Sequence, residues 1–142
     1  MQSVKYRTQM ANLLVVTGNT ALKAAWSEGT VLGKTFRYQG EKMLDYLLSL
    51  VEKEKPEVLT IASVHGVLPE EEEILKNHCS HLLILDSRHT SLLLKHNFPE
   101  YLPWDRAAGL LAARFLFNDK PCTVFDFGTT LTIDFMGSDG RY

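Results

Sequence analysis

The fold of this chain is decided by the stretch DFGTTLTID at residues 126–134. An apolar run leads into Asp126, a turn follows at Gly128, Thr129 and Thr130, and a second alternating run begins at Leu131. A strand that ends on a carboxylate and turns through glycine and threonine presents backbone N–H groups and hydroxyls to a phosphate, while the carboxylate can hold a metal ion. We therefore predict a phosphate-binding turn between two strands.

A related stretch, LLVVTGNT, stands at residues 13–20 near the other end of the sequence. It is again an apolar strand that runs into a Gly-x-Thr turn, made here by Gly18, Asn19 and Thr20. Two such turns, one in each half of a duplicated arrangement, predict a nucleotide-binding clamp. The second half is only begun at Tyr142, and the sequence leaves open whether the chain is a fragment of a longer protein.

The composition is that of an ordinary globular domain. The 142 residues are 45% apolar and 23% charged, a length that suits about one domain. The net charge of −2, without clusters of lysine and arginine, gives no electrostatic reason to propose nucleic acid or an anionic membrane as a partner. No apolar run approaches the ~20 residues that span a bilayer. Residues 1–11 are expected to form an N-terminal extension rather than a signal peptide, so we expect a cytoplasmic protein.

The two cysteines, Cys79 and Cys122, are far apart and lack the spacing of a metal site. A disulfide between them is the alternative, but a domain of this size does not need one. We interpret both residues as buried thiols in a reducing compartment.

The hydrophobic periodicity predicts an α/β domain with a mixed sheet. Short alternating or continuous apolar runs predict strands, and apolar residues at helical spacing predict helices. We expect three antiparallel strands at 12–16, 22–26 and 31–38, then a helix at 43–55, a strand at 58–64, a helix at 69–78, a strand at 81–86 and a closely packing, small-residue helix at 105–117. Residues 87–103 are predicted to be the least regular part of the chain.

This order, βββαβαβα, describes a first domain at residues 12–121. The predicted hairpin of residues 123–128 and 131–137 then opens a second, truncated domain at residues 122–142. In that hairpin a strand, a Gly-x-Thr turn and a strand repeat the arrangement of residues 12–26.

Three short motifs resemble those of the type III pantothenate kinases, a family of the acetate kinase, sugar kinase, Hsp70 and actin superfamily. GNT at residues 18–20 with Lys23 is similar to the family motif Asp-x-Gly-Asn-Thr-x-x-Lys. Asp105 followed by Arg106 resembles Gly-x-Asp-Arg, and residues 126–134 are similar to Asp-x-Gly-Thr-Ala-x-Thr-x-Asp. The order and spacing of these motifs carry the resemblance, which covers residues 12–142 and about the N-terminal half of a family member.

The resemblance implies a ribonuclease H-like, actin-like ATPase domain. It implies the ATP-dependent phosphorylation of pantothenate to 4′-phosphopantothenate in coenzyme A biosynthesis, with Mg²⁺ and a monovalent cation, K⁺ or NH₄⁺. It also implies a homodimer in which pantothenate binds near the subunit contact.

By the same resemblance, Asp105 is the base that takes the proton from the substrate hydroxyl, a task that suits a carboxylate within hydrogen-bond reach. Asp126 is expected near the metal ions, and Tyr101 and Arg106 are expected to contact pantothenate. The residues expected to bind ATP and its phosphates are Gly18, Asn19, Thr20, Lys23, Gly128, Thr129 and Thr130.

Two positions depart from the family motifs. Val16 stands where the family has Asp, and Pro103 replaces the glycine of Gly-x-Asp-Arg. These departures favour a second hypothesis, a catalytically degenerate family member that acts as a binding or transcription-accessory module, whereas the retained Asp105 and Asp126 favour a kinase. A third hypothesis, an unrelated small α/β binding domain, requires the two Gly-x-Thr turns to be a coincidence.

Overall fold

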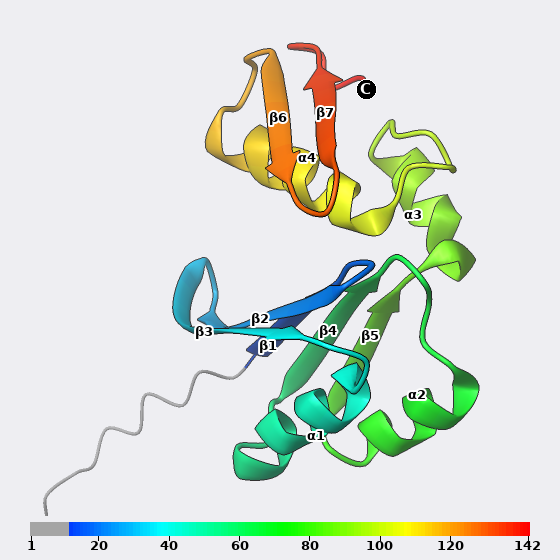
Figure 1. Cartoon of the computed structure of the whole chain (residues 1–142). Coiled ribbons are helices and arrows are strands. Elements are labelled where there is room, and N and C mark those ends of the chain that lie inside the picture. Colours follow the sequence, from blue (N-terminus) through cyan, green and yellow to red (C-terminus); the bar gives the residue numbers. More distant parts are fainter. Residues whose placement is uncertain (1–11) are drawn as a thin grey trace, which may run out of the picture.

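A five-stranded mixed sheet, in the order β3-β2-β1-β4-β5, forms the base on which the other elements are placed (Figure 1). The computed structural model describes residues 12–142, so the extension expected at residues 1–11 lies outside the described residues. The strands of this sheet are β1 (Asn12–Thr17), β2 (Ala21–Glu28), β3 (Val31–Gln39), β4 (Val58–Ser63) and β5 (His81–Leu85).

The pairing of the strands confirms the mixed sheet. β1 pairs antiparallel with β2, and β2 pairs antiparallel with β3. β1 also pairs parallel with β4, which in turn pairs parallel with β5. Three antiparallel strands therefore open the domain, and the later strands enter after helical crossovers, as parallel pairing requires.

One face of the sheet is covered by helices α1 (Met43–Lys53) and α2 (Pro69–Lys76) (Figure 1). In α1, Leu47, Leu50 and Val51 recur at helical spacing and are buried. They pack against inward-facing strand residues such as Leu13 and Ile61 in one core. Burying each such side chain contributes roughly 1.5–3 kcal/mol, which makes this core the main support of the sheet.

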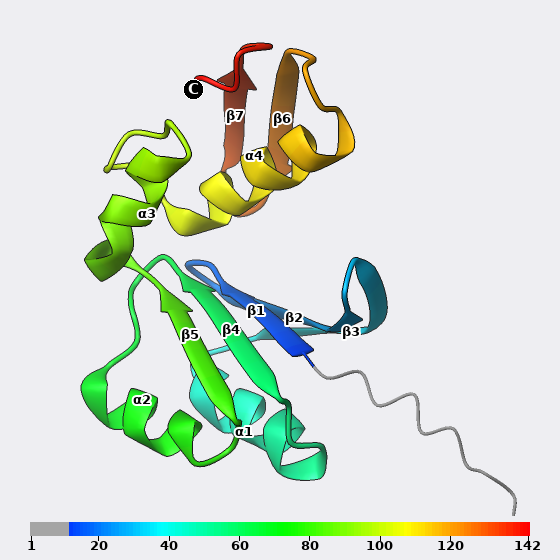
Figure 2. The same cartoon turned by 180° about the vertical axis from the view of Figure 1, so that it is seen from behind.

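Helix α4 (Trp104–Leu116) lies on the other side of the sheet from α1 and α2, and the hairpin of β6 (Cys122–Phe127) and β7 (Leu131–Met136) packs on α4, as both views show (Figure 1 and Figure 2). The buried residues of this second core are Ala62, Leu93, Phe98, Leu102, Trp104, Ala107, Leu110 and Met136. Ala107 is fully buried, and a Cβ atom added to Gly109 would lie 3.5 Å from Cγ1 of Val124. The small residues of α4 therefore allow the close packing that the sequence predicts.

Residues 87–103 are more regular than predicted, because they contain the 3-10 helix η1 (Ser87–His89) and helix α3 (Thr90–Lys95). The predicted order βββαβαβα is therefore wrong by one short helix. Helix α3 has six residues and one buried side chain, Leu93, so the sequence shows no helical period there. The ends of the other elements lie within two residues of the predicted ends, the usual variation at frayed termini.

Both cysteines are free thiols, as expected, but only Cys79 is buried. The prediction of a buried Cys122 is wrong, because this residue begins β6 at the rim of the second core and is half-buried. Within residues 12–142 no helix combines the length and apolar character needed to cross a bilayer.

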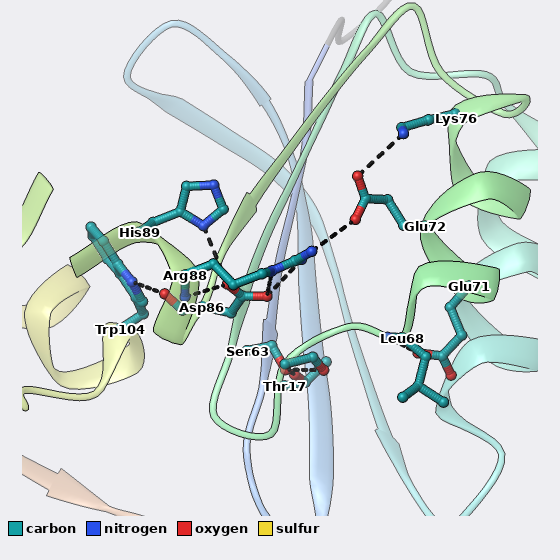
Figure 3. A network of polar contacts seen from close by, with 11 residues as sticks. Thr17, Ser63, Leu68, Glu71, Glu72, Lys76, Asp86, Arg88, His89 and Trp104 are labelled. Atoms are coloured by element: carbon teal, nitrogen blue, oxygen red, sulfur yellow. Dashed lines mark hydrogen bonds and ion pairs between the residues drawn. The ribbon is translucent and has the colours of Figure 1, made fainter. Parts of the chain in front are cut away.

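A network of polar contacts joins the end of β5 to the start of α4 (Figure 3). Asp86 is buried and accepts hydrogen bonds from the backbone N–H of Arg88 at 2.9 Å and from its side-chain Nε. Hydrogen bonding by Arg88 lowers the pKa of Asp86 to about 2. The indole Nε1 of Trp104 donates to the carbonyl oxygen of Asp86 at 2.9 Å. The first residue of α4 is therefore held at a fixed place beside the sheet.

We expect Trp104→Phe to lower the free energy of unfolding by about 1–3 kcal/mol, because the substitution removes the indole donor and leaves the Asp86 carbonyl without it. Urea unfolding followed by far-UV circular dichroism measures this loss. Trp26→Phe is the matched control, since Trp26 is 6% exposed and Trp104 is 5% exposed, while the indole of Trp26 forms no side-chain hydrogen bond with residues 12–142. An equal loss in the two variants contradicts a role for the hydrogen bond.

Candidate functional site

The two Gly-x-Thr turns meet in space. The turn between β1 and β2 and the turn between β6 and β7 are joined by a hydrogen bond between the hydroxyls of Thr20 and Thr129, whose oxygens are 3.0 Å apart across a sequence separation of 109 residues. Each turn is closed by its glycine, because Gly18 N–H donates to the carbonyl of Ala21 at 2.9 Å and Gly128 N–H donates to that of Thr130 at 3.1 Å. The hydroxyls and the N–H groups after each glycine are thus the polar groups that remain for a ligand.

A cleft of about 480 Å³ lies between the sheet and the hairpin at this meeting point. All of the predicted site residues line it except Tyr101 and Arg106. Those that line it are Gly18, Asn19, Thr20, Lys23, Asp105, Asp126, Gly128, Thr129 and Thr130. A wider hollow of about 740 Å³ lies over the start of α1. It reaches neither Asp105 nor Asp126, so we place the candidate site in the cleft.

Asp105 lies in the first turn of α4, where the positive end of the helix dipole favours a carboxylate. The residue at the N-cap is Pro103, and Asp105 makes no capping hydrogen bond, so it does not serve merely to cap the helix. Its Oδ1 atom and the Oγ1 atom of Thr132, which also lines the cleft, are buried without a hydrogen-bond partner among residues 12–142. Leaving a buried polar atom without a partner is costly, so such atoms call for an explanation, and a ligand in the cleft supplies one.

Asp126 is the second carboxylate of the cleft, and it points inward from β6. Within residues 12–142 no group of three or more histidine, cysteine and acidic side chains is close enough to hold a metal ion. Mg²⁺ in kinase sites is usually bound by one or two carboxylates together with the phosphates of the substrate. Asp126 therefore fits Mg²⁺ only in the presence of a nucleotide, and Val16, which lines the same cleft, supplies no further ligand.

Tyr101 and Arg106 lie outside the cleft lining. Tyr101 is 79% exposed before the start of α4. Arg106 is directed to Asp134 of β7, and its Nε lies 3.1 Å from Oδ1 and 3.0 Å from Oδ2 of that carboxylate. The hydroxyl of Tyr142 donates to the same carboxylate at 2.9 Å.

The pairing of Arg106 with Asp134 was not predicted from the sequence, although Arg106 was expected to contact pantothenate and Asp134 ends the stretch at residues 126–134. Asp134 is only 2% exposed, and hydrogen bonds from Arg106 hold the pKa of its carboxyl below the usual range. Its place could have been inferred from the alternation of β7, where Thr132, Asp134 and Met136 share the inner face with the second core. The pair joins α4 to the hairpin and so sets Asp105 relative to the turn at residues 128–130.

An α/β domain in which two Gly-x-Thr turns face one polar cleft is consistent with an actin-like kinase domain. The sequence matches the family described as Type III pantothenate kinase over residues 12–142. The chain belongs to the type III pantothenate kinase family.

Individual relatives support this assignment. The chain is 32% identical over 133 residues to the type III pantothenate kinase of Bacteroides fragilis (strain YCH46), an alignment that covers 92% of this chain and 54% of the relative. It is 29% identical over 140 residues to the type III pantothenate kinase of Dichelobacter nodosus (strain VCS1703A), with 92% and 55% covered. It is 25% identical over 131 residues to that of Azobacteroides pseudotrichonymphae, with 92% and 53% covered. The chain thus spans about half the length of the curated relatives it matches.

We expect Asp134→Asn to lower the free energy of unfolding by about 3 kcal/mol, because it leaves the Arg106 guanidinium next to a neutral group; this is the lower end of the cost of breaking a buried pair, since Arg106 is partly exposed. The folded-state pKa of Asp134 lies below the unfolded value, so its contribution is present above that value, about 3.9, and is lost as the pH falls. The free energy of unfolding of the variant should therefore fall less steeply than that of the wild type as the pH is lowered.

Denaturant unfolding between pH 2 and pH 7 measures both effects. Asp139→Asn is the matched control, because Asp139 pairs with Arg141 on the surface, and an exposed pair contributes about 0–1 kcal/mol. If the two variants lose the same stability, the pair of Arg106 and Asp134 does not hold α4 to the hairpin.

Proposed function

We propose that this chain supplies the N-terminal part of the catalytic site of a pantothenate kinase, which transfers a phosphoryl group from ATP to pantothenate and forms 4′-phosphopantothenate. The observation that carries the proposal is the contact between Thr20 and Thr129, because it brings both Gly-x-Thr turns to the cleft that also contains Asp105. The family assignment supports the same reaction.

In the proposed reaction Asp105 is the general base. Its Oδ1 atom has a free hydrogen-bonding capacity within residues 12–142, which suits acceptance of a proton from the hydroxyl of pantothenate. The hydroxyl oxygen then attacks the γ-phosphorus of ATP, the bond from that phosphorus to the β–γ bridging oxygen breaks, and ADP leaves. Phosphoryl transfer asks a protein mainly for positioning and charge neutralisation, so one base and a few phosphate-binding groups suffice.

The two turns are proposed to hold the phosphates. Thr20, Thr129 and Thr130 offer hydroxyls, and the N–H groups that follow each glycine offer further donors. Lys23 of β2 supplies a positive charge on the sheet side of the cleft. Asp126 would bind the ions; Mg²⁺, when bound with the nucleotide, supplies neutralisation of phosphate charge. The same proposal includes a monovalent cation and a cytoplasmic location. It also includes a homodimer with pantothenate near the subunit contact, and contacts from Tyr101 or Arg106 to pantothenate.

We further propose that the hairpin of β6 and β7 opens a second domain in a chain of family length. The support is the outer face of this two-stranded sheet, where alternate residues of both strands are apolar and between 53% and 78% exposed: Phe125, Phe127, Leu131, Ile133 and Phe135. A contiguous apolar face of this kind usually marks a contact surface. The C-terminal half that the relatives possess would cover it and complete the enclosure of ATP.

A catalytically degenerate member, acting as a binding or transcription-accessory module, is the second candidate. The observation in its favour is Val16, which lines the cleft at the position of the family's first Asp. Both candidates use the same fold, so turnover separates them.

The test of the kinase uses this chain and a family-length chain that contains it. We expect the longer chain to bind Mg²⁺·ATP and pantothenate by calorimetry and to release ADP in a coupled assay. Asp105→Asn should reduce turnover at least about 100-fold, since general base catalysis typically contributes that much, while the Kd for Mg²⁺·ATP stays unchanged. Asp119→Asn, in an exposed turn away from the cleft, is the control. Ligand binding without turnover would identify the degenerate module.

We expect Val16→Asp in the family-length chain to tighten Mg²⁺·ATP binding on the order of tenfold, because a carboxylate at this place in the cleft would be a ligand for the Mg²⁺ ion that the phosphates carry. Calorimetric titration measures the change. Val16→Asn is the control, since it adds a polar group of the same size without the charge. Equal affinities in the two variants would count against the loss of a metal ligand at this position.

A further inference from the structure

The sheet side of the cleft contains two positively charged residues that lie side by side on adjacent strands. Lys23 of β2 and Arg37 of β3 are register partners in the antiparallel pair, so their side chains leave the same face of the sheet. Both line the cleft. The neighbouring pair in the direction of the turn, Ala21 and Gln39, lines it as well.

This juxtaposition is unfavourable unless something else neutralises it. Like charges directly opposite on an antiparallel pair destabilise the sheet. Within residues 12–142 neither Lys23 nor Arg37 forms an ion pair or a side-chain hydrogen bond, although two carboxylates line the same cleft. Asp105 and Asp126 stand on the other wall, on α4 and β6, so the cleft has a cationic side and an acidic side.

We propose that Arg37 is a phosphate-binding residue, and that it forms with Lys23 a cationic pair that binds the polyphosphate chain of the nucleotide. The planar guanidinium offers paired N–H donors that match two phosphate oxygens, while the lysine ammonium acts as a point charge. An anion between the two side chains would remove their mutual repulsion. The turn at Gly128, Thr129 and Thr130 on the hairpin closes the site from the opposite side.

The pair also accounts for how a site with Val16 can retain phosphate. The half-buried Val16 is the register partner of Lys23 and carries no charge, so it does not neutralise the lysine. The positive charges of Lys23 and Arg37 are therefore available to neutralise the phosphates. The inference rests on the proposed nucleotide site, but it concerns the binding of polyphosphate and does not require turnover.

The experiment is calorimetric titration of inorganic tripolyphosphate into the 142-residue chain at low ionic strength, for the wild type and three variants. Arg37→Gln should bind at least about tenfold more weakly, the effect of losing a charge-assisted hydrogen-bonding group. Arg37→Lys should bind tripolyphosphate with an intermediate affinity, because the lysine keeps the positive charge and lacks the paired N–H donors of the guanidinium. Lys34→Gln is the matched control: it removes one positive charge from the same strand, and Lys34 lies over the ring of Phe36, outside the cleft lining.

Thermal unfolding separates a binding role from a structural one. Without ligand, Arg37→Gln should melt at the same temperature as the wild type or higher, because the repulsion with Lys23 is relieved. The rise in Tm that tripolyphosphate gives to the wild type should be lost in Arg37→Gln and kept in Lys34→Gln.

Three results overturn the inference: no binding of tripolyphosphate by the wild type, unchanged binding by Arg37→Gln, or equal weakening by Arg37→Gln and Lys34→Gln. The kinase proposal fails separately. If tripolyphosphate binds through Arg37 but the family-length chain releases no ADP, the cationic pair stands and the catalytic role of Asp105 is wrong.

Discussion

The position of the first turn of α4 is the constraint on which the candidate site depends. Two residues of this turn hold it in place. Trp104 donates a hydrogen bond to the carbonyl of Asp86 beside the sheet, and Arg106 binds Asp134 of the hairpin. Asp105 lies between them and keeps a buried oxygen without a partner among residues 12–142. Because anchors on both sides fix the backbone, the carboxylate of Asp105 is held toward the cleft without using its own hydrogen bonds. A buried oxygen without a hydrogen-bond partner costs stability, and the contacts of Trp104 and Arg106 offset that cost.

The same helix decides how close the two turns come. Ala107 and Gly109 allow α4 to approach the sheet and the hairpin, and the hairpin then reaches across to the turn between β1 and β2. The contact between Thr20 and Thr129 is an exposed hydrogen bond and contributes little by itself. The contact between Thr20 and Thr129 is therefore a consequence of how the second core positions the hairpin.

Much of the candidate site could be predicted because its motifs are local. Gly18, Thr20, Gly128 and Thr129 were recognisable from turn chemistry after apolar strands, and all four line the cleft. The role of Arg37 was not recognised because nothing within a few residues of it indicates one, and the partner of Asp134 was not recognised although Asp134 ends the stretch at residues 126–134. Arg37 matters through its register with Lys23 on another strand, and Asp134 matters through a contact with Arg106, 28 residues away.

The sequence by itself determined the alternation of strands and helices, because apolar periods and turn residues act over a few positions. It also determined the family, through three short motifs in a fixed order. It could not determine helix α3, where a single buried leucine leaves no period to read. Only the tertiary structure decided that Arg106 pairs with Asp134 and that Lys23 and Arg37 lie together on one wall of the cleft. These properties arise from packing between distant segments, whose relative positions no local pattern encodes.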